Sequence, residues 1–303
     1  MLVKKFLSLI KFSHTIFAMP FALIGFFLGL SEPGFNLRGT QPATIVFKGI
    51  VWSVIVSKFI LVLLCMVFAR SAAMAFNRYL DRNFDAKNPR TALREIPAGI
   101  LSASSTLWFT IICSLLFMVC CWFINWLCFL LSPVALFVVL GYSYTKRFTP
   151  LCHLILGLGL SLAPIGAYLA VTEQFGIIPV IFSFTVLTWV SGFDIIYALQ
   201  DEEFDRSQKL YSIPAAVGKV NALRISRLLH MSSVIFVVVA GLYGAFGWLY
   251  WIGVVFFAGM LVYQHSIVKP HDLRRVNIAF MTANGIASVV FAVFVIGDIL
   301  LHF

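Results

Sequence analysis

Apolar stretches long enough to cross a lipid bilayer recur along the whole sequence and limit the folds open to it. A membrane-spanning helix needs about 20 consecutive, mostly apolar residues. Of the 303 residues, 61% are hydrophobic and 11% are charged, and the mean hydropathy is +0.99. A soluble domain of this length could not bury so much apolar surface. The sequence therefore predicts an all-α integral membrane protein.

Nine such stretches can be distinguished, and we expect nine transmembrane helices around a central cavity, in one domain covering residues 1–303. Their approximate bounds are 12–30, 50–76, 102–122, 125–142, 152–171, 177–199, 229–247, 250–266 and 277–300. The first follows a basic N-terminal segment and continues to Leu30, which is longer than the apolar core of a cleaved signal peptide. We therefore expect it to remain as the first span.

Basic residues are concentrated on one side of this arrangement. With nine spans, the N-terminal segment and the segments 77–101, 143–151, 200–228 and 267–276 share a side, and they hold 18 of the 22 Lys and Arg residues. An excess of Lys and Arg marks cytoplasmic loops, so the N-terminus is predicted to be cytoplasmic and the C-terminus outside. The net charge of +10 is then mainly a topology signal, and no nucleic acid partner is expected.

Two acidic runs fall on this predicted cytoplasmic side, each where a span ends. Asn77, Asp81 and Asp85 are spaced four residues apart and share one face of a helix, and Asp201 and Asp205 repeat the spacing four spans later. Like charges at that spacing repel, and unpaired charge beside apolar segments is costly. The two runs therefore predict a shared divalent cation. Magnesium fits best, because it prefers oxygen ligands and is usually bridged to substrate phosphate by one or two carboxylates.

The first run alone would also fit a solvated helix end, in which Arg78 and Arg82 neutralise the carboxylates. The second run at an equivalent position favours the metal site.

Two ionisable residues lie deeper in the predicted spans. Asp194 precedes Asp201 by about two helical turns, and Arg70 precedes Asn77 by the same distance. An ionisable residue at membrane depth indicates a functional site, although these two could also simply neutralise each other.

Further cations lie near the acidic runs. Arg90 and Arg94 follow the first run, and Lys146 ends the fourth span together with Tyr142. Around a metal–phosphate site such cations would stabilise charge developing on a leaving group. The remaining candidates for metal ligands are histidines without ligand spacing, which we expect to be structural: His153, His230, His265 and His271.

With these features the chain resembles the UbiA superfamily of intramembrane prenyltransferases over nearly its whole length. The resemblance rests on nine spans, an NxxxDxxxD motif after the second and a DxxxD motif after the sixth. It implies two Mg²⁺ ions that hold the diphosphate of a polyprenyl donor, with Asn77, Asp81, Asp85, Asp201 and Asp205 as ligands.

The same resemblance implies roles for other residues. It places Tyr142 and Lys146 on the diphosphate, and Tyr197 beside the second motif. Arg70 would lie in the central cavity, on the acceptor carboxylate or the diphosphate. Asp194 is expected to orient the acceptor phenol or to take up its ring proton.

Two segments resemble a bacterial branch of 4-hydroxybenzoate polyprenyltransferases and of prenyltransferases of the futalosine menaquinone route. They are 88–99, which contains Arg90 and Arg94, and 211–215. The ubiquinone enzymes usually have Asn-Arg-Pro-Leu after the first motif, and this chain does not. This favours 1,4-dihydroxy-6-naphthoate over 4-hydroxybenzoate as the acceptor in respiratory quinone synthesis. The expected location is a bacterial inner membrane, with the active site facing the cytoplasm.

Other functions fit less well. A divalent-cation transporter would place its carboxylates near the membrane centre on broken helices, whereas here only Asp194 is deep. A CDP-alcohol phosphotransferase needs a DG and AR pattern that the sequence lacks. Haem farnesylation is a third alternative, against which the Pro-Ala-Gly and Ser-Ile-Pro segments argue.

Overall fold

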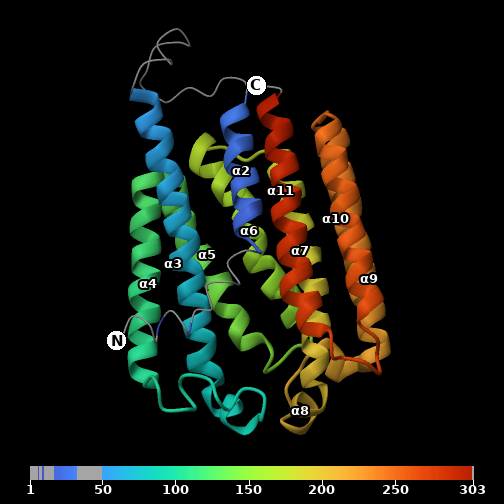
Figure 1. Cartoon of the computed structure of the whole chain (residues 1–303). Coiled ribbons are helices and arrows are strands. Elements are labelled where there is room, and N and C mark those ends of the chain that lie inside the picture. The colour runs from blue at the N-terminus through green and yellow to red at the C-terminus, as the bar shows by residue number, and fades with distance from the viewer. Residues whose placement is uncertain (1–5, 7–8, 10–16, 33–49, 302–303) are drawn as a thin grey trace.

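The structure is a computed structural model that describes residues 6, 9, 17–32 and 50–301, apart from the side chains of residues 50 and 51. These residues form a bundle of helices that run back and forth between two ends (Figure 1). The helices are α2 (Met19–Ser31), α3 (Ile50–Lys87), α4 (Ala103–Ile124), α5 (Trp126–Thr145), α6 (Cys152–Thr172), α7 (Ile177–Ala198), the short η3 (Leu199–Asp201), α8 (Glu202–Ser207), α9 (Ile213–Tyr243), α10 (Trp248–Ile267), the π-helix η4 (Ile278–Ala283) and α11 (Asn284–Leu301).

The predicted all-α membrane architecture is confirmed. Within the described residues, eight helices are long and apolar enough to cross a membrane, and α2 is a shorter apolar helix of 13 residues. The predicted start of the first span, at residue 12, lies outside the described residues. The loops also alternate as expected, because the segments 88–102, 146–151, 199–212 and 268–277 meet at one end of the bundle, where α8 lies in Figure 1. We refer to it as the polar end.

Two helix boundaries differ from the prediction, and both differences extend helices at the polar end. α3 continues to Lys87 instead of ending at 76, so the first acidic run is helical, and Asn77 Nδ2 donates to Asp81 Oδ2 at 3.0 Å. α9 begins at Ile213 instead of 229. Ser212 caps it by accepting from the Ala215 amide at 3.3 Å, and Pro214 occupies its first turn.

The start of α9 was missed because polar and basic residues interrupt its apolar pattern. Lys219, Arg224 and Arg227 lie on the helix and not in a loop. Gly218 makes a kink there, with φ +79° and ψ 162°, a backbone conformation that residues with a side chain rarely adopt.

The opposite end of the bundle carries exposed aromatic side chains. Trp122 and Trp126 lie at the α4–α5 turn, and Tyr243 and Trp248 lie at the α9–α10 turn, with exposed fractions between 55% and 66%. Tryptophan and tyrosine are enriched where a membrane protein meets the lipid headgroups. These residues therefore mark a membrane interface away from the polar end.

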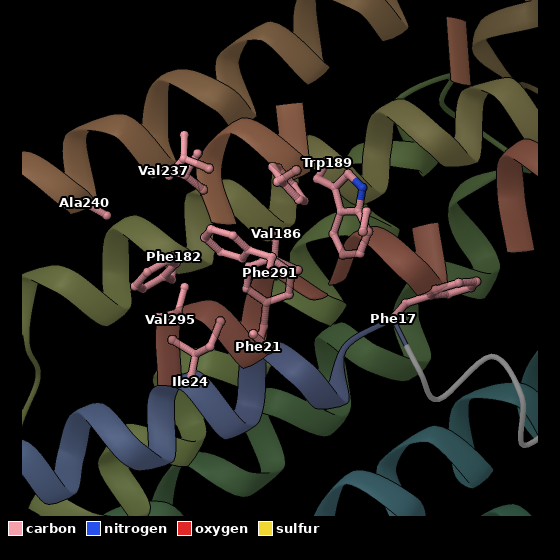
Figure 2. Packing of buried hydrophobic residues seen from close by; sticks show 14 of the residues in the cluster. Phe17, Phe21, Ile24, Phe182, Val186, Trp189, Val237, Ala240, Phe291 and Val295 are labelled. Atoms are coloured by element: carbon pink, nitrogen blue, oxygen red, sulfur yellow. The ribbon is translucent and has the colours of Figure 1, made fainter. Parts of the chain in front are cut away.

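The largest buried cluster joins α2, α7, α9, α10 and α11 (Figure 2). Phe21 of α2 lies at its centre, with ring centroids 5.4 Å from Trp189 and 5.8 Å from Phe291. Phe17 and Phe193, at the edge of the cluster, also line a cavity that lies toward the polar end. The packing of this cluster therefore forms one wall of that cavity.

A buried amide network holds the π-helix η4 in place. The Asn284 side-chain oxygen accepts from Trp189 Nε1 at 2.9 Å and from Gln264 Nε2 at 2.7 Å. Its nitrogen donates to the carbonyl of Phe280 at 3.0 Å, in the segment where the regular helical hydrogen bonds shift. Because lipid offers no partner for backbone groups, this side chain supplies one. It also fixes Phe280 in the cavity wall.

The tight packing of α2 against α6 gives a stability prediction. A Cβ atom at Gly25 would lie 2.0 Å from the Pro164 carbonyl oxygen, whereas a Cβ at Gly166, on the same pair of helices, would meet nothing within 4 Å. We expect Gly25→Ala to lower the free energy of unfolding by about 1–3 kcal/mol, because backbone must move to admit the methyl group. Gly166→Ala should be neutral or stabilising. Thermal unfolding of detergent-purified protein measures both, and equal midpoints would contradict this packing.

Candidate functional site

A cavity of about 270 Å³ lies toward the polar end and collects nearly all residues predicted for the site. Its lining includes Arg70, Asn77, Asp81, Asp85, Arg90, Arg94, Tyr142, Lys146, Asp194, Tyr197 and Asp201. Asp205 is the exception, since it is fully buried behind Lys146 and is not part of the lining. Helices far apart in the sequence thus bring the two acidic runs to one cavity. Asn88, just after α3, links them directly by donating to Asp201 Oδ1 at 3.1 Å.

Each carboxylate of the two runs pairs with one basic side chain from another element. The pairs are Asp81 with Arg147 at 3.0 Å, Asp85 with Arg94 at 2.6 Å, Asp205 with Lys146 at 2.7 Å, and Asp201 with Arg90 through two guanidinium nitrogens. Four negative charges therefore face four positive charges. In this arrangement the predicted diphosphate contacts Arg90, Arg94 and Lys146 are engaged with the predicted metal ligands.

The alternative in which Arg78 and Arg82 neutralise the first acidic run is wrong, because Asp81 and Asp85 pair with Arg147 and Arg94. Arg82 donates instead to the Tyr79 carbonyl oxygen at 2.5 Å and stacks on the Tyr79 ring. Arg78 is buried and lines the cavity, and its Nε has no acceptor among the described residues. The carboxylates take cations from the 88–101 segment and the end of α5, because those side chains approach across the cavity.

All four cations lie outside the membrane spans, and for Lys146 and Arg90 the pairing secures the positive charge. Burial alone would lower the pKa of Lys146, but the charge of Asp205 and the hydrogen bond to it outweigh burial and raise that pKa above its ordinary value. Burial acts against Arg90 in the same way, and its hydrogen bonds to Asp201 again raise the pKa. Both side chains therefore stay protonated near neutral pH.

The acidic runs have the chemistry of a site for a hard cation, although they are not assembled into one. Asp85 Oδ2 and Asp205 Oδ2 are buried and accept no hydrogen bond from the described residues. Unsatisfied carboxylate oxygens of this kind are ligands that Mg²⁺ accepts. Nowhere in the described parts of the chain, however, do three acidic, histidine or cysteine side chains converge closely enough to hold a metal ion. Metal binding would require the ion pairs to rearrange.

Deeper in the cavity, Arg70 has no counter-ion. Its Nη2 contacts only the Met74 sulfur, at 3.9 Å, its Nε is buried without an acceptor, and no described carboxylate lies within ion-pair distance. The alternative in which Arg70 and Asp194 neutralise each other is therefore wrong. Asp194 pairs instead with His153, whose Nδ1 lies 2.6 Å from Asp194 Oδ2. An unpaired guanidinium lining a cavity is a ready site for an anionic group.

We call the end of the cavity that carries the acidic runs and their paired cations its mouth. Tyr197 joins this mouth to the apolar wall of the cavity. Its hydroxyl accepts from Arg90 Nη1 at 2.9 Å, and its ring stacks on Phe280 with centroids 4.2 Å apart. The contact with Arg90 supports a role in positioning that cation.

Three cavity residues were missed or interpreted differently from the sequence: Asn88, Arg78 and His153. The same holds for Arg147, which pairs with Asp81 but is not part of the lining. Arg147 follows Lys146 directly and was counted among the basic residues that predict the orientation in the membrane. His153 lies 41 residues before Asp194, and no spacing rule links residues on separate helices.

The fold and the site define a helical membrane protein with a cavity that combines a charged mouth and an apolar wall. The model of the UbiA prenyltransferase family matches residues 43–286, and the chain belongs to this family. It is therefore a prenyltransferase, as the resemblance predicted.

Individual relatives agree with this assignment. The chain is 29% identical over 238 residues to a 4-hydroxybenzoate octaprenyltransferase of Francisella tularensis subsp. tularensis (strain WY96-3418), covering 78% of this chain and 82% of the relative. A protein of the same name from Tolumonas auensis is 29% identical over 223 residues, with coverage of 74% and 78%.

Solved structures share the fold. The apo structure of a UbiA homolog from Aeropyrum pernix K1 matches with a TM-score of 0.75 and 26% identity, over 95% of this chain and 98% of that chain. A UbiA homolog from Archaeoglobus fulgidus, bound to DMAPP and Mg²⁺, matches with a TM-score of 0.70 and 20% identity, over 98% and 99%.

The Lys146–Asp205 pair gives a second stability prediction. Replacing Lys146 by Met leaves the fully buried Asp205 carboxylate without its cation, and we expect the free energy of unfolding to fall by about 3 kcal/mol. The double variant Lys146→Met with Asp205→Asn removes both charges and should recover most of that loss. Thermal unfolding without added metal measures both variants, and a single variant as stable as the wild type would show that the pair contributes nothing.

Proposed function

We propose that this prenyltransferase transfers a polyprenyl group from a polyprenyl diphosphate to an aromatic acid that carries a hydroxyl group, in the synthesis of a respiratory quinone. The observation that carries the proposal is the division of the cavity into two zones. Its mouth holds the acidic runs and four cations, and its interior holds the unpaired Arg70 near Asp194. The relatives named as 4-hydroxybenzoate octaprenyltransferases support an aromatic acid as acceptor.

The mouth suits a diphosphate with Mg²⁺. Two Mg²⁺ ions would be held together with the diphosphate by Asn77, Asp81, Asp85, Asp201 and Asp205. The Archaeoglobus homolog bound to DMAPP and Mg²⁺ supports such a ligand. When bound, Mg²⁺ acts as a Lewis acid that draws charge onto the leaving diphosphate.

The basic residues of the mouth then have new partners. Arg90, Arg94, Lys146 and Arg147 exchange their carboxylates for diphosphate oxygens, to which they donate hydrogen bonds as negative charge develops there.

The proposed reaction breaks one bond in the donor, forms one bond to the acceptor and transfers one proton to this chain. The allylic C–O bond of the donor breaks, and its electron pair leaves with the diphosphate. A ring carbon next to the acceptor hydroxyl forms the new bond to the prenyl carbon, and Asp194 takes up the ring proton. Phe17, Phe193 and Phe280 line the cavity, where they exclude water and present π faces to the developing carbocation.

Helix geometry favours the acceptor carboxylate as the partner of Arg70. Along α3, Asn77 lies seven residues from Arg70 and Asp81, the first carboxylate, lies eleven residues from it, which correspond to about 10 and 16 Å. A diphosphate held between the carboxylates of the two acidic runs does not span the longer distance. An acid bound by Arg70 would place its ring between the guanidinium and the mouth, within the zone that Asp194 lines.

We favour 1,4-dihydroxy-6-naphthoate over 4-hydroxybenzoate as the acceptor. Support comes from the segment 88–99, which differs from the ubiquinone enzymes and supplies Arg90 and Arg94 to the mouth. The basic residues at the polar end support a cytoplasmic position for this end, in the inner membrane of a bacterium, with the active site facing the cytoplasm. The aromatic residues at the other end agree with that orientation.

The first test is prenyl transfer by purified protein in detergent, with Mg²⁺, geranyl diphosphate and each acceptor in turn, read by mass spectrometry. We expect product with 1,4-dihydroxy-6-naphthoate, and less or none with 4-hydroxybenzoate. Removal of Mg²⁺ by EDTA should abolish turnover. Product with 4-hydroxybenzoate alone would overturn the choice of acceptor, and product with neither acid would overturn the class of acceptor.

The role of Arg70 gives a separate prediction. Arg70→Met should raise the KM for the acceptor at least tenfold, because one hydrogen-bonded charge pair is worth about 1.5–3 kcal/mol. The KM for geranyl diphosphate should change less than threefold. Steady-state kinetics with each substrate varied in turn separates the two effects. A rise in the KM for geranyl diphosphate alone would assign Arg70 to the diphosphate.

A further inference from the structure

The deep zone of the cavity contains a carboxylate and a histidine in direct contact. His153 lies in the first turn of α6 and is buried, and its Nδ1 is 2.6 Å from Asp194 Oδ2 on α7. Both side chains line the cavity. The Asp194 side chain keeps 21% of its surface exposed, whereas that of His153 keeps 4%. The carboxylate is thus the member of the pair that substrate can reach.

A backbone amide determines where the imidazole carries its proton. The Ile213 N–H, at the start of α9, donates to His153 Nε2 at 3.3 Å. A backbone amide can only donate, so Nε2 acts as an acceptor and the ring proton is on Nδ1. That proton points at Asp194 Oδ2, which therefore accepts a hydrogen bond as a carboxylate.

The backbone that carries the His153 side chain and its partners is also held by hydrogen bonds. Ser191 Oγ donates to the His153 carbonyl oxygen at 3.1 Å, and Ser191 is one turn from Asp194 on α7. The Ser212 cap fixes the Ile213 amide at the start of α9. Three helices therefore fix the direction of the Nδ1–H bond, and with it the plane of the Asp194 carboxylate.

We propose that His153 is a positioning residue for prenyl transfer. Its Nδ1–H holds Oδ2 of Asp194 and leaves Oδ1, which has no donor among the described residues, for the acceptor. In the reaction the ring proton of the acceptor moves to Oδ1, while His153 keeps its own proton throughout. This inference rests on the proposed role of Asp194 as the group that takes up that proton.

The roles of the two imidazole nitrogens can be tested separately. The amide nitrogen of an Asn side chain can take the place of Nδ1, so His153→Asn keeps a donor for Asp194 and loses the acceptor for Ile213. The amide oxygen of a Gln side chain reaches the place of Nε2, so His153→Gln keeps the acceptor for Ile213 and loses the donor for Asp194. The exposed His271, in the loop before η4, provides a control as His271→Gln.

We expect His153→Gln to lower kcat by about 10- to 100-fold, the usual effect of losing a group that orients a reacting side chain. The KM for geranyl diphosphate should stay within threefold, since the diphosphate binds at the mouth. His153→Asn should recover most of kcat, and His271→Gln should match the wild type. A purely structural role at the Ile213 contact predicts the reverse order, with His153→Asn the more damaged variant, and that result would overturn the proposal. Thermal unfolding midpoints show whether each variant remains folded.

Asp194→Asn separates this inference from the proposed function. If Asp194→Asn is inactive and His153→Gln turns over normally, the role of Asp194 stands and the role of His153 falls. If Asp194→Asn turns over normally, the proposed role of Asp194 is contradicted, and the proposed role of His153 is contradicted with it. The expected result is that both single variants are impaired and that the double variant is no worse than Asp194→Asn, because His153 acts only through Asp194.

Discussion

The pairing of four carboxylates with four cations from other elements is the interaction on which the site depends. Pairing lowers the cost of a buried charge beside lipid-facing helices. Asp85 and Asp205 are buried, and each meets a cation from a different part of the chain. These contacts tie the segment after α3 and the residues that follow α5 to the end of α3, to η3 and to α8. They keep the mouth of the cavity assembled and electrically balanced before any ligand binds, and they place the cations where a diphosphate would arrive.

Apolar packing of α2 against α7, α9, α10 and α11 contributes the other half of the site. Phe21 and Trp189 lie at the centre of this core, and its outer members Phe17 and Phe193 form part of the cavity wall. Asn284 satisfies the carbonyls of a π-helix that would otherwise be costly in lipid, and this places Phe280 against Tyr197. The apolar wall and the charged mouth therefore meet at Tyr197, whose ring packs on Phe280 while its hydroxyl accepts from Arg90.

The sequence predicts the membrane spans and the residues of the site better than it predicts which of these residues form ion pairs with one another. Apolar length gives the helices, and the spacing of Asp81 and Asp85 gives their common face. The start of α9 was predicted too far along the chain, because Lys219 and its basic neighbours interrupt the apolar pattern of a helix that Ser212 caps. Arg78 was considered as an alternative partner of a carboxylate because it is near in sequence, but Arg94 and Arg147 reach the acidic run from elsewhere in the fold. The contact of His153 with Asp194 depends on two helices packing side by side, and no local pattern encodes it.

One helix sets the scale of the whole site. Arg70, Asn77, Asp81 and Asp85 lie at intervals of seven, four and four residues on α3, so they share a face and line one cavity. Seven residues correspond to about 10 Å along the axis between the backbone positions of Arg70 and Asn77. In the proposed reaction, the acceptor ring and the allylic end of the donor would share this part of the cavity. The two proposed acceptors differ in how much of it they would fill, since a bicyclic acid is larger than a single ring, and the length of one uninterrupted helix thus bears on the proposed choice between them.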